Sequence, residues 1–194
     1  MKLDKEFYLQ TNVLKIAKDL IGKVVFSKIE GKLTSGIITE TEAYDGVVDR
    51  ASHAFNGKRT PRNEHMYSEG GTAYVYYCYG IHSLFNVVTN QKDVPHAVLI
   101  RGLKPLDGIE LMQLRRAKIK ADKMLSIGPG SVSKAMGIHV KHNGISLLGN
   151  KIWIEDKGIK VPESLIQLTP RIGVESAKEA ALYPYRFVVN NNLV

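Results

Sequence analysis

The sequence has a single cysteine, Cys78, so no disulfide can form within its 194 residues. Such cysteine usage is typical of a reducing compartment, and we expect a cytoplasmic protein. The six histidines are scattered, and nowhere do Cys and His residues come at the close spacing of a structural zinc site. The first residues lack the apolar stretch of a signal peptide, and no apolar run approaches the ~20 residues of a membrane span. We therefore expect neither a secreted protein nor a membrane protein.

Acidic residues are also in deficit. The chain carries 27 Lys and Arg against 19 Asp and Glu, a formal net charge of +8. This excess favours a polyanionic partner, and nucleic acid more than a membrane surface. A basic protein whose charge only keeps it in solution is the alternative. With 44% hydrophobic residues the chain is long enough to bury a core, and we expect one domain over residues 1–194.

The first predicted elements are a helix and a β-hairpin. In residues 11–22 apolar side chains such as Val13 and Ile16 recur at helical spacing. Thr11 or Asn12 can cap this helix, and Gly22 is placed to end it. Residues 23–44 predict a β-hairpin that turns at residues 30–32.

Three further strands are predicted within residues 72–80, 83–90 and 96–103, and we expect them to be consecutive in an antiparallel sheet. A helix is predicted from Asp107, with Glu110 completing a capping box, and a short helix is predicted to end at Gly137. Residues 143–155 predict a turn and a strand, and residues 174–189 predict a short helix and a last strand. This order predicts an α+β fold, a single domain with a curved, mainly antiparallel β-sheet flanked by helices.

The stretch "ETEAY" ends the predicted hairpin. It places Glu40, Glu42 and Tyr44 on one face of a strand, because alternate residues of a strand share a face. Residues 45–71 then form a long predicted loop, and loops of this length are usually functional or disordered. If Glu42 is buried near aromatic side chains, burial raises its pKa and prepares it to act as a base or an acid. The alternative is an exposed strand glutamate paired with a lysine.

Tyrosines crowd the next predicted strand, "TAYVYYCYG", which contains Tyr74, Tyr76, Tyr77 and Tyr79. A strand this rich in tyrosine usually belongs to a core and its rim. On a basic protein it is alternatively a platform on which nucleic-acid bases stack. The residues by themselves leave both interpretations open.

The motifs "ETEAY", a histidine nine residues after Tyr44, "TPRN", "YVYYCYG", "FNVV", "VLIRGLKP" and "GPG" follow one another along the chain. In order and spacing they resemble the alkyladenine (3-methyladenine) DNA glycosylase family, the methylpurine-DNA glycosylases, from the first hairpin to "YPYRF". The resemblance implies a monofunctional enzyme that flips alkylated or deaminated purines out of duplex DNA. It would hydrolyse the N-glycosidic bond with a water activated by a glutamate, which starts base excision repair. The chain departs from the family pattern after "GPG", where Ser131 and Val132 replace a basic residue and a leucine.

The resemblance implies roles for individual residues of a base pocket. Glu42 corresponds to the general base, and Arg101 to an arginine that holds the water and the phosphate of the flipped nucleotide. Tyr44 and Tyr76 correspond to two aromatic walls, which favour an electron-poor ring by about 0.5–2 kcal/mol. The other two pocket residues are His53, at the pocket edge, and Asn86, which crowds the exocyclic amino group of guanine.

Other residues correspond to DNA contacts outside that pocket. Tyr79 corresponds to a wedge that enters the minor groove and fills the gap left by the extruded base. Lys58, Thr60 and Arg116 fall where the family contacts phosphates. For Glu40 we predict a structural ion pair or hydrogen bond, with a role as catalytic acid as the alternative.

The resemblance implies no metal and no organic cofactor, because water is the nucleophile. It implies a monomer that acts on double-stranded DNA containing damaged purines, associated with the nucleoid if the source is a bacterium. 3-Methyladenine, 7-methylguanine, hypoxanthine and ethenoadenine are all substrates that the sequence allows.

Three rival functions share some of these features. "IGPGSVSKAMGI" weakly resembles the helix-hairpin-helix turn of glycosylases that use a catalytic Asp or Lys, but no aromatic pocket accompanies it there. A non-catalytic nucleic-acid binding module would share the basic charge and the tyrosines, although Glu42 would then oppose binding. A nucleosidase for small molecules would not need the charge of +8, and its binding would be indifferent to salt.

Overall fold

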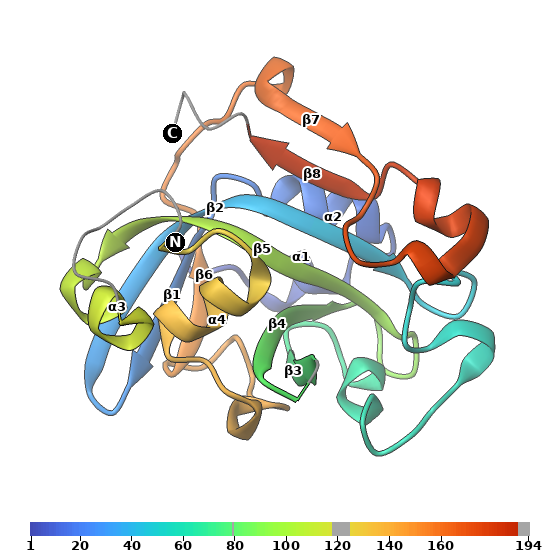
Figure 1. Ribbon diagram of the computed structural model, residues 1–194, viewed down its shortest axis with the longest axis horizontal. Coiled ribbons are helices and arrows are strands. Elements are labelled where there is room, and N and C mark those ends of the chain that lie inside the picture. Colours follow the sequence, from blue (N-terminus) through green and yellow to red (C-terminus); the bar gives the residue numbers. More distant parts are fainter. Residues whose placement is uncertain (79, 118–124, 190–194) are drawn as a thin grey trace.

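The computed structural model describes residues 1–78, 80–117 and 125–189 (Figure 1). The strands are β1 (Val24–Ile29), β2 (Lys32–Asp45), β3 (Ala73–Cys78), β4 (His82–Thr89), β5 (His96–Asp107), β6 (Ile152–Glu155), β7 (Ile166–Thr169) and β8 (Arg186–Val189). The α-helices are α1 (Lys5–Leu9), α2 (Val13–Asp19), α3 (Ile109–Arg116) and α4 (Pro129–Met136). The short 3-10 helices are η1 (Phe55–Gly57), η2 (Glu64–Tyr67), η3 (Val140–His142), η4 (Glu163–Leu165) and η5 (Glu175–Leu182).

The strands form one open sheet, and the pairs described are all antiparallel. Its order is β3-β4-β5-β2-β1-β6, and β8 pairs with both β2 and β7. β2 changes partner along its length, because β1 pairs with it only as far as Ile37 and β8 pairs with it from Glu40 to Glu42. Irregular register at Glu40 marks a bulge on the β5 side, and bulges bend strands. The predicted α+β fold with a curved, mainly antiparallel sheet is confirmed.

The sheet separates an apolar core from a polar hollow, because side chains alternate between the two faces of a strand. On β2, Thr41 faces α2, where its Oγ1 donates a hydrogen bond to the Ala17 carbonyl oxygen, and Ala43 is buried in the core. From β3, β4 and β5 the core receives Val75, Phe85, Val87, Val98 and Ile100. The alternate residues of the same strands line the hollow: Tyr74, Tyr76, Leu84, Asn86, Leu99 and Arg101.

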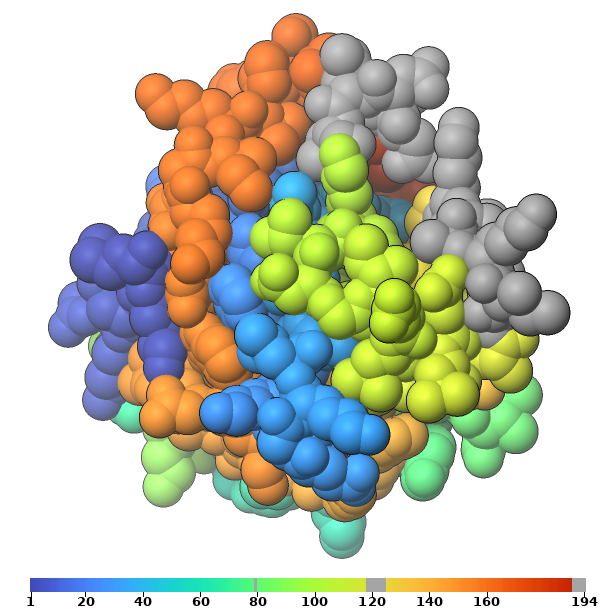
Figure 2. Space-filling view, turned by 90° about the vertical axis from the view of Figure 1, so that its left-hand side faces the viewer, coloured from blue at the N-terminus to red at the C-terminus, as the bar shows by residue number. Residues whose placement is uncertain are grey.

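Helices complete this core. Asn12 caps α2 by accepting a hydrogen bond from the Lys15 N–H, and α4 ends at Gly137, both as predicted. In Figure 1, α1 and α2 lie behind β2 and β5, whereas α3 and α4 lie in front. Figure 2 shows the β1–β2 hairpin, in blue, at the side of the molecule, with α3 and the end of β5 next to it in yellow-green. In the described ranges no helix is both long and apolar enough to cross a bilayer.

The start of α3 differs from the sequence prediction, because Asp107 does not cap a helix. Asp107 ends β5, and its carboxylate accepts a hydrogen bond from the Ser35 hydroxyl of β2. The chain turns at Gly108, whose φ of +70° suits glycine, and α3 begins at Ile109 without a side-chain cap. The short elements α1 and β7, with five and four residues, are not indicated by the sequence patterns.

Candidate active site

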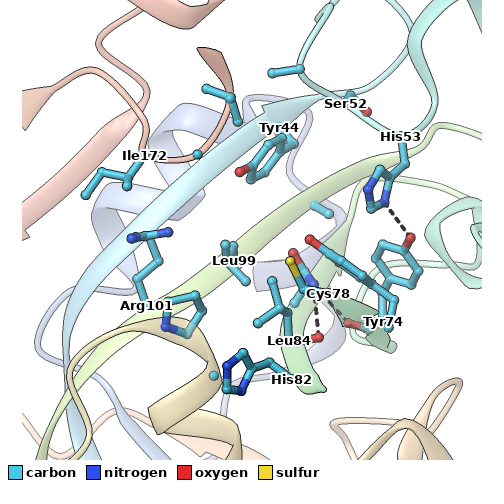
Figure 3. Close-up of a pocket in the computed structure, with 18 of the residues that line it drawn as sticks. Tyr44, Ser52, His53, Tyr74, Cys78, His82, Leu84, Leu99, Arg101 and Ile172 are labelled. Carbon is cyan, nitrogen blue, oxygen red and sulfur yellow. Dashed lines mark hydrogen bonds between the residues drawn. The ribbon is translucent and has the colours of Figure 1, made fainter. Parts of the chain in front are cut away.

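A cavity of about 820 Å³ opens on the face of the sheet that carries Tyr44 and Arg101. Its walls come from β2, β3, β4 and β5, the loop after β2, the start of α4 and residues 172–177. Figure 3 shows Tyr44, His53 and Arg101 on different sides of this space. Because neighbouring strands send alternate side chains into it, residues far apart in the sequence meet there.

Glu42 lies beneath the cavity wall and is completely buried. Its Oε1 accepts a hydrogen bond of 2.8 Å from the Ile172 N–H and lies 3.3 Å from the Nε of Arg101. Its Oε2 accepts a hydrogen bond of 2.9 Å from the Tyr44 hydroxyl. Since Tyr44, Arg101 and Ile172 all line the cavity, the carboxylate sits one layer behind these three residues.

The pKa of Glu42 is raised above its ordinary value, chiefly because burial disfavours the charged carboxylate. Arg101, the Ile172 N–H and the Tyr44 hydroxyl oppose this rise, because each stabilises the charged form. A general base works best when its pKa lies near the working pH, so a rise from the ordinary glutamate value suits that role. The prediction that Glu42 is buried beside an aromatic side chain is confirmed, and the alternative of an exposed glutamate is wrong.

The predicted ion pair of Glu40 is present. Its Oε1 accepts hydrogen bonds of 2.9 Å from the Nε of Arg101 and 2.6 Å from the Nε of Arg186. Arg186 belongs to β8, and its Nη1 also donates to the Thr169 hydroxyl in β7. Glu40 therefore connects β5, β2 and β8 immediately next to Glu42.

Arg101 is 8% exposed and lines the cavity. Its Nε is shared between the carboxylates of Glu40 and Glu42. The terminal nitrogens Nη1 and Nη2 have no hydrogen-bond partner within the described ranges of the chain. These N–H groups are therefore available to a ligand in the cavity, as the predicted contacts with a water and a phosphate require.

Tyr44, Tyr74 and Tyr76 supply much of the aromatic lining of the cavity. Burial, reinforced by the charge of Glu42, raises the pKa of Tyr44 well above its ordinary value, so its hydroxyl remains a donor to that carboxylate. The ring centroids of Tyr74 and Tyr76 lie 5.2 Å apart in a tilted arrangement. The cavity thus presents aromatic rings on which a flat base can stack.

His53 stands at the edge of this aromatic group. Its ring centroid lies 4.6 Å from that of Tyr76 in an edge-to-face contact, and its Nδ1 lies 2.8 Å from the Tyr74 hydroxyl. Loss of water around the ring lowers the pKa of His53, and the cations Arg62 and Lys58 lower it further. The imidazole is therefore neutral at neutral pH and does not repel a positively charged base.

Asn86 belongs to β4 and lines the cavity with only 3% of its surface exposed. Its Nδ2 donates hydrogen bonds of 3.1 Å to the Tyr74 carbonyl oxygen and 3.4 Å to the Leu84 carbonyl oxygen. These bonds fix the amide against the backbone of two strands. A side chain held in this way can exclude a ligand by its bulk, because it does not turn aside.

A smaller hollow of about 370 Å³ adjoins the main cavity and shares His53 and Arg62 with it. Lys58 and Thr60 line this second hollow, and the Thr60 hydroxyl donates a hydrogen bond to Asn63. The cationic side chains around it are exposed and make it basic: Arg50, Lys58 and Arg62. Lys58 and Thr60 therefore lie next to the cavity, although their contacts with phosphates stay a prediction.

Arg116, which is predicted to contact DNA, is not brought to either hollow. Arg116 lies on α3, where its Nε donates a hydrogen bond of 3.1 Å to the Leu125 carbonyl oxygen, and it lines neither space. Tyr79 lies outside the described residues. Their roles stay predictions, as do the catalytic and binding roles of the cavity residues.

Sequence reasoning missed Arg171 and Ile172, which precede η5. Ile172 acts through its backbone N–H, which leaves no side-chain pattern to detect. Arg171 is buried beside Tyr44, but an arginine outside any predicted helix or strand is usually exposed. The short "TPRIG" stretch around these residues was the one available signal, because proline and glycine mark a chain that turns sharply.

Metal-binding side chains do not gather at the cavity. Within residues 1–78, 80–117 and 125–189, no three His, Cys, Asp or Glu side chains are grouped so that they could hold a metal ion. The cavity offers instead aromatic rings, a buried carboxylate behind its wall, and arginines that include Arg101 with its unused donors. This set can stack a flat ring, accept a proton and bind an anion.

Proteins similar to this chain include several that are described as DNA glycosylases. A family model described as methylpurine-DNA glycosylase matches residues 6–193. A Chlamydia felis protein, provisionally named 3-methyladenine DNA glycosylase, is 47% identical over 189 residues, which are 97% of this chain and 96% of the relative. A Clostridium perfringens protein of the same name is 40% identical over 200 residues, 99% of this chain and 97% of the relative. One from Desulfitobacterium hafniense is 40% identical over 199 residues, with 98% and 96% covered.

Proposed function

Because this chain belongs to the methylpurine-DNA glycosylase family, we propose that it flips alkylated or deaminated purines out of duplex DNA and hydrolyses their N-glycosidic bond with a water activated by Glu42. Family membership makes it a DNA N-glycosylase, a hydrolase that acts in DNA repair. The observation that carries the proposal is the complete burial of the Glu42 carboxylate within hydrogen-bonding distance of Tyr44 and beside Arg101.

In the proposed reaction, a bond forms between the oxygen of water and C1′ of the deoxyribose, and the bond from C1′ to the purine nitrogen breaks. Glu42 accepts a proton from the water, and the electrons of the broken bond leave with the base. The sugar passes through a state with oxocarbenium character, which the negative charge of Glu42 stabilises. A base alkylated at N3 or N7 is already cationic, so it departs as a neutral molecule without an acid.

The hydrogen bonds of Glu42 leave room for this water. A carboxylate has about four acceptor positions, and the Ile172 N–H and the Tyr44 hydroxyl occupy one on each oxygen, while the Nε of Arg101 lies 3.3 Å from Oε1. We assign the free position on Oε2, the oxygen away from Arg101, to the proton of the water. Since the carboxylate is completely buried, we infer that the water reaches it when the side chain of Ile172, a residue that is 50% exposed, moves aside as the nucleotide enters, while the Ile172 N–H keeps its hydrogen bond.

We assign the flipped base to the space between Tyr44 and Tyr76, with the neutral His53 at its edge. The cavity of about 820 Å³ falls within the roughly 300–1,000 Å³ of pockets that take small ligands. Asn86 would exclude the exocyclic amino group of normal guanine, because its amide is fixed. The unused N–H groups of Arg101 would bind the phosphate of the flipped nucleotide and the water.

Outside the pocket, we assign the wedge in the minor groove to Tyr79 and the phosphate contacts to Lys58, Thr60 and Arg116. The basic hollow that Lys58 and Thr60 line supports part of this assignment. One copy of residues 1–194 suffices in this scheme, because a single extruded nucleotide needs a single pocket. Water and side chains supply the whole reaction, so the proposal requires no cofactor.

The test is a base-release assay on duplexes that each carry one defined lesion, with the wild-type protein and Glu42→Gln side by side. We expect the wild type to release at least the methylated purines. Glu42→Gln should lose roughly 10²–10⁴-fold in the rate of release, because the water then lacks its base. It should still bind the lesion duplex, since an amide has the same size and keeps an acceptor for Tyr44.

Binding is measured in parallel by fluorescence anisotropy at several salt concentrations. Excision by Glu42→Gln at the wild-type rate would refute the assignment of the base. An affinity that is indifferent to salt would refute the proposed contacts with phosphates, because displaced counterions make such binding depend steeply on salt.

A further inference from the structure

We propose that Arg171 is a positioning residue of this reaction, which holds Tyr44 and the Ile172 N–H against Glu42 without touching the substrate. The inference rests on the proposed function of Glu42 as the base. Arg171 does not line the cavity, so any effect it has on the reaction passes through residues that do.

The guanidinium of Arg171 joins two distant segments of the chain. Its Nη1 donates to the Ala43 carbonyl oxygen at 2.8 Å and to the Asp49 carboxylate. Its Nη2 donates to the other Asp49 oxygen at 2.8 Å and to the Ala180 carbonyl oxygen at 3.1 Å. Asp49 in turn accepts hydrogen bonds from the backbone N–H groups of Asp45 and Ala51. The buried side chain thus ties the end of β2 and its loop to residues 171–180.

Arg171 supports Tyr44 from the side of the protein. Its Cζ lies 4.8 Å from the centroid of the Tyr44 ring and 5.1 Å from that of Tyr185. Ala43, whose carbonyl oxygen it binds, lies between Glu42 and Tyr44 in β2, and the Ala43 N–H donates to the Tyr185 carbonyl oxygen. The C=O and N–H groups of Ala43 are therefore both hydrogen-bonded, the first to Arg171 and the second to Tyr185. This fixes the backbone between Glu42, the proposed base, and Tyr44, the proposed wall of the pocket.

Arg171 also fixes the position of the next residue. The Ile172 N–H donates to Glu42, yet residues 170–174 belong to no helix or strand that could hold it. On one side of Ile172, the Gly173 N–H donates to the nearby, exposed Glu175, whereas Arg171 on the other side is hydrogen-bonded to Asp49, Ala43 and Ala180 in the interior. Lysine keeps the positive charge, but its ammonium cannot bind both carboxylate oxygens in one plane or stack on Tyr44 as a flat guanidinium does.

Loss of this anchor has a signature in the pH dependence of the reaction. Burial raises the pKa of Glu42, and the hydrogen bond from the Ile172 N–H partly opposes that rise. When the hydrogen bond is lost, the pKa of Glu42 therefore rises further. The base is then ionised only at higher pH, and the acidic limb of the rate profile moves upward. Lysine at position 171 leaves the charges and hydroxyls around Glu42 unchanged in number: Glu40 and Tyr44 of β2, Tyr76 of β3, Arg101 of β5 and Arg186 of β8.

The experiment compares Arg171→Lys with the wild type in single-turnover release of 7-methylguanine across a range of pH. We expect the rate to fall roughly 10- to 100-fold, because an error of about 1 Å in placement can cost that much. The acidic limb should move to higher pH, while the affinity for the lesion duplex stays at the wild-type value, since no residue that lines the cavity has changed.

Arg115→Lys is the matched control, because Arg115 is a partly buried arginine whose Nη1 donates to the Ala135 carbonyl oxygen away from the cavity. It should keep the wild-type rate and pH profile. Asp49→Glu, which keeps the ion pair but displaces the guanidinium by one methylene group, provides a second variant with the same expected signature if Arg171→Lys does not fold.

Wild-type rate and pH profile in Arg171→Lys would overturn the positioning role, and so would an equal loss in Arg115→Lys. These results are distinguishable from failure of the proposed function. If the proposed function of Glu42 is wrong, Glu42→Gln will release the base as fast as the wild type, whatever the arginine variants do.

Discussion

Two buried arginines flank the end of β2, and they use their hydrogen bonds in opposite ways. Arg101 contacts Glu40 and Glu42 through its Nε and keeps both terminal nitrogens without a partner among the residues described. Arg171 uses both terminal nitrogens for Asp49 and for two backbone carbonyl oxygens. Arg101 lines the cavity, whereas Arg171 does not.

The comparison shows that burial and charge do not by themselves identify a residue that meets the substrate. Both arginines are less than a tenth exposed, and both are paired with a carboxylate. What separates them is the number of donors left over after the protein's own acceptors are satisfied. An arginine whose terminal nitrogens are free at a cavity can bind a phosphate or a water there. The terminal nitrogens of Arg171 are all bound to the protein, and its Nε, which has no partner in the described part of the chain, is buried away from the cavity, so Arg171 can act on a ligand only through its neighbours.

The largest effect should come from removing the partner of Arg171. Asp49→Asn leaves a buried guanidinium without its counter-charge, which we expect to cost about 3–5 kcal/mol in the free energy of unfolding. Unfolding in urea measures this loss. Glu40→Gln should cost less, because Arg101 retains Glu42 and Arg186 is partly exposed. If Asp49→Asn and Glu40→Gln lost the same free energy of unfolding, the proposed difference between the surroundings of Arg171 and those of Arg101 would be refuted.

Arg101→Gln should give the next largest effect, and the effect should be on the reaction. Removal of an electrostatic contact to a transition state commonly costs about 10²–10³-fold in rate, and we expect base release to slow by that amount. The pKa of Glu42 should also rise, because Arg101 stabilises its charged form. Single-turnover assays across pH measure both changes. A variant that lost only stability, with the wild-type rate of base release, would refute a contact between Arg101 and the reacting nucleotide.

The smallest effect concerns the stability of the site at different pH values. The pKa of Glu42 is raised in the folded protein, so between about pH 4.3 and that raised value the folded state binds more protons than the unfolded state. The free energy of unfolding therefore falls as the pH rises through this interval. Glu42→Gln removes this titration.

The melting temperature of Glu42→Gln relative to the wild type should therefore be higher at about pH 7 than at about pH 4. Each tenfold difference in proton affinity between the folded and unfolded states contributes about 1.4 kcal/mol to this change. Differential scanning calorimetry at the two pH values measures it. A difference that stayed constant with pH would mean that the charged form of Glu42 is not penalised by burial, and the reason for treating it as a prepared base would be lost.

Much of the fold was predictable because its long elements carry regular patterns. The β1–β2 hairpin, the strands β3 to β5 and the helix that ends at Gly137 follow from alternation, helical spacing and turn residues. The capping box at Asp107 failed, because the Ser35 hydroxyl of a neighbouring strand competes for the same carboxylate. A contact between strands far apart in the sequence cannot be seen in a window of a few residues.

The residues of the candidate site could likewise be predicted only where they stand in a motif of a few neighbouring residues. Glu42, Tyr44 and Arg101 stand in motifs whose order in the sequence resembles a known family, and the structure brings them together. Arg171 and Ile172 escaped, because one acts through buried hydrogen bonds and the other through its backbone. Residues that support a site from behind follow from the packing of the whole chain and carry no local pattern of their own.

The carboxylate of Glu42 accepts one of its hydrogen bonds from Ile172, 130 positions further along the chain. The neighbouring Glu40 accepts one from Arg186, 146 positions further along. A ribosome makes residues in order, so the glutamate leaves the exit tunnel long before Ile172 and Arg186 exist. Until translation has passed those residues, a growing chain lacks these two donors, which hold the acid in place. We therefore expect a chain that stops before these residues to be unable to release bases from DNA, so that activity begins only after translation has passed Arg186.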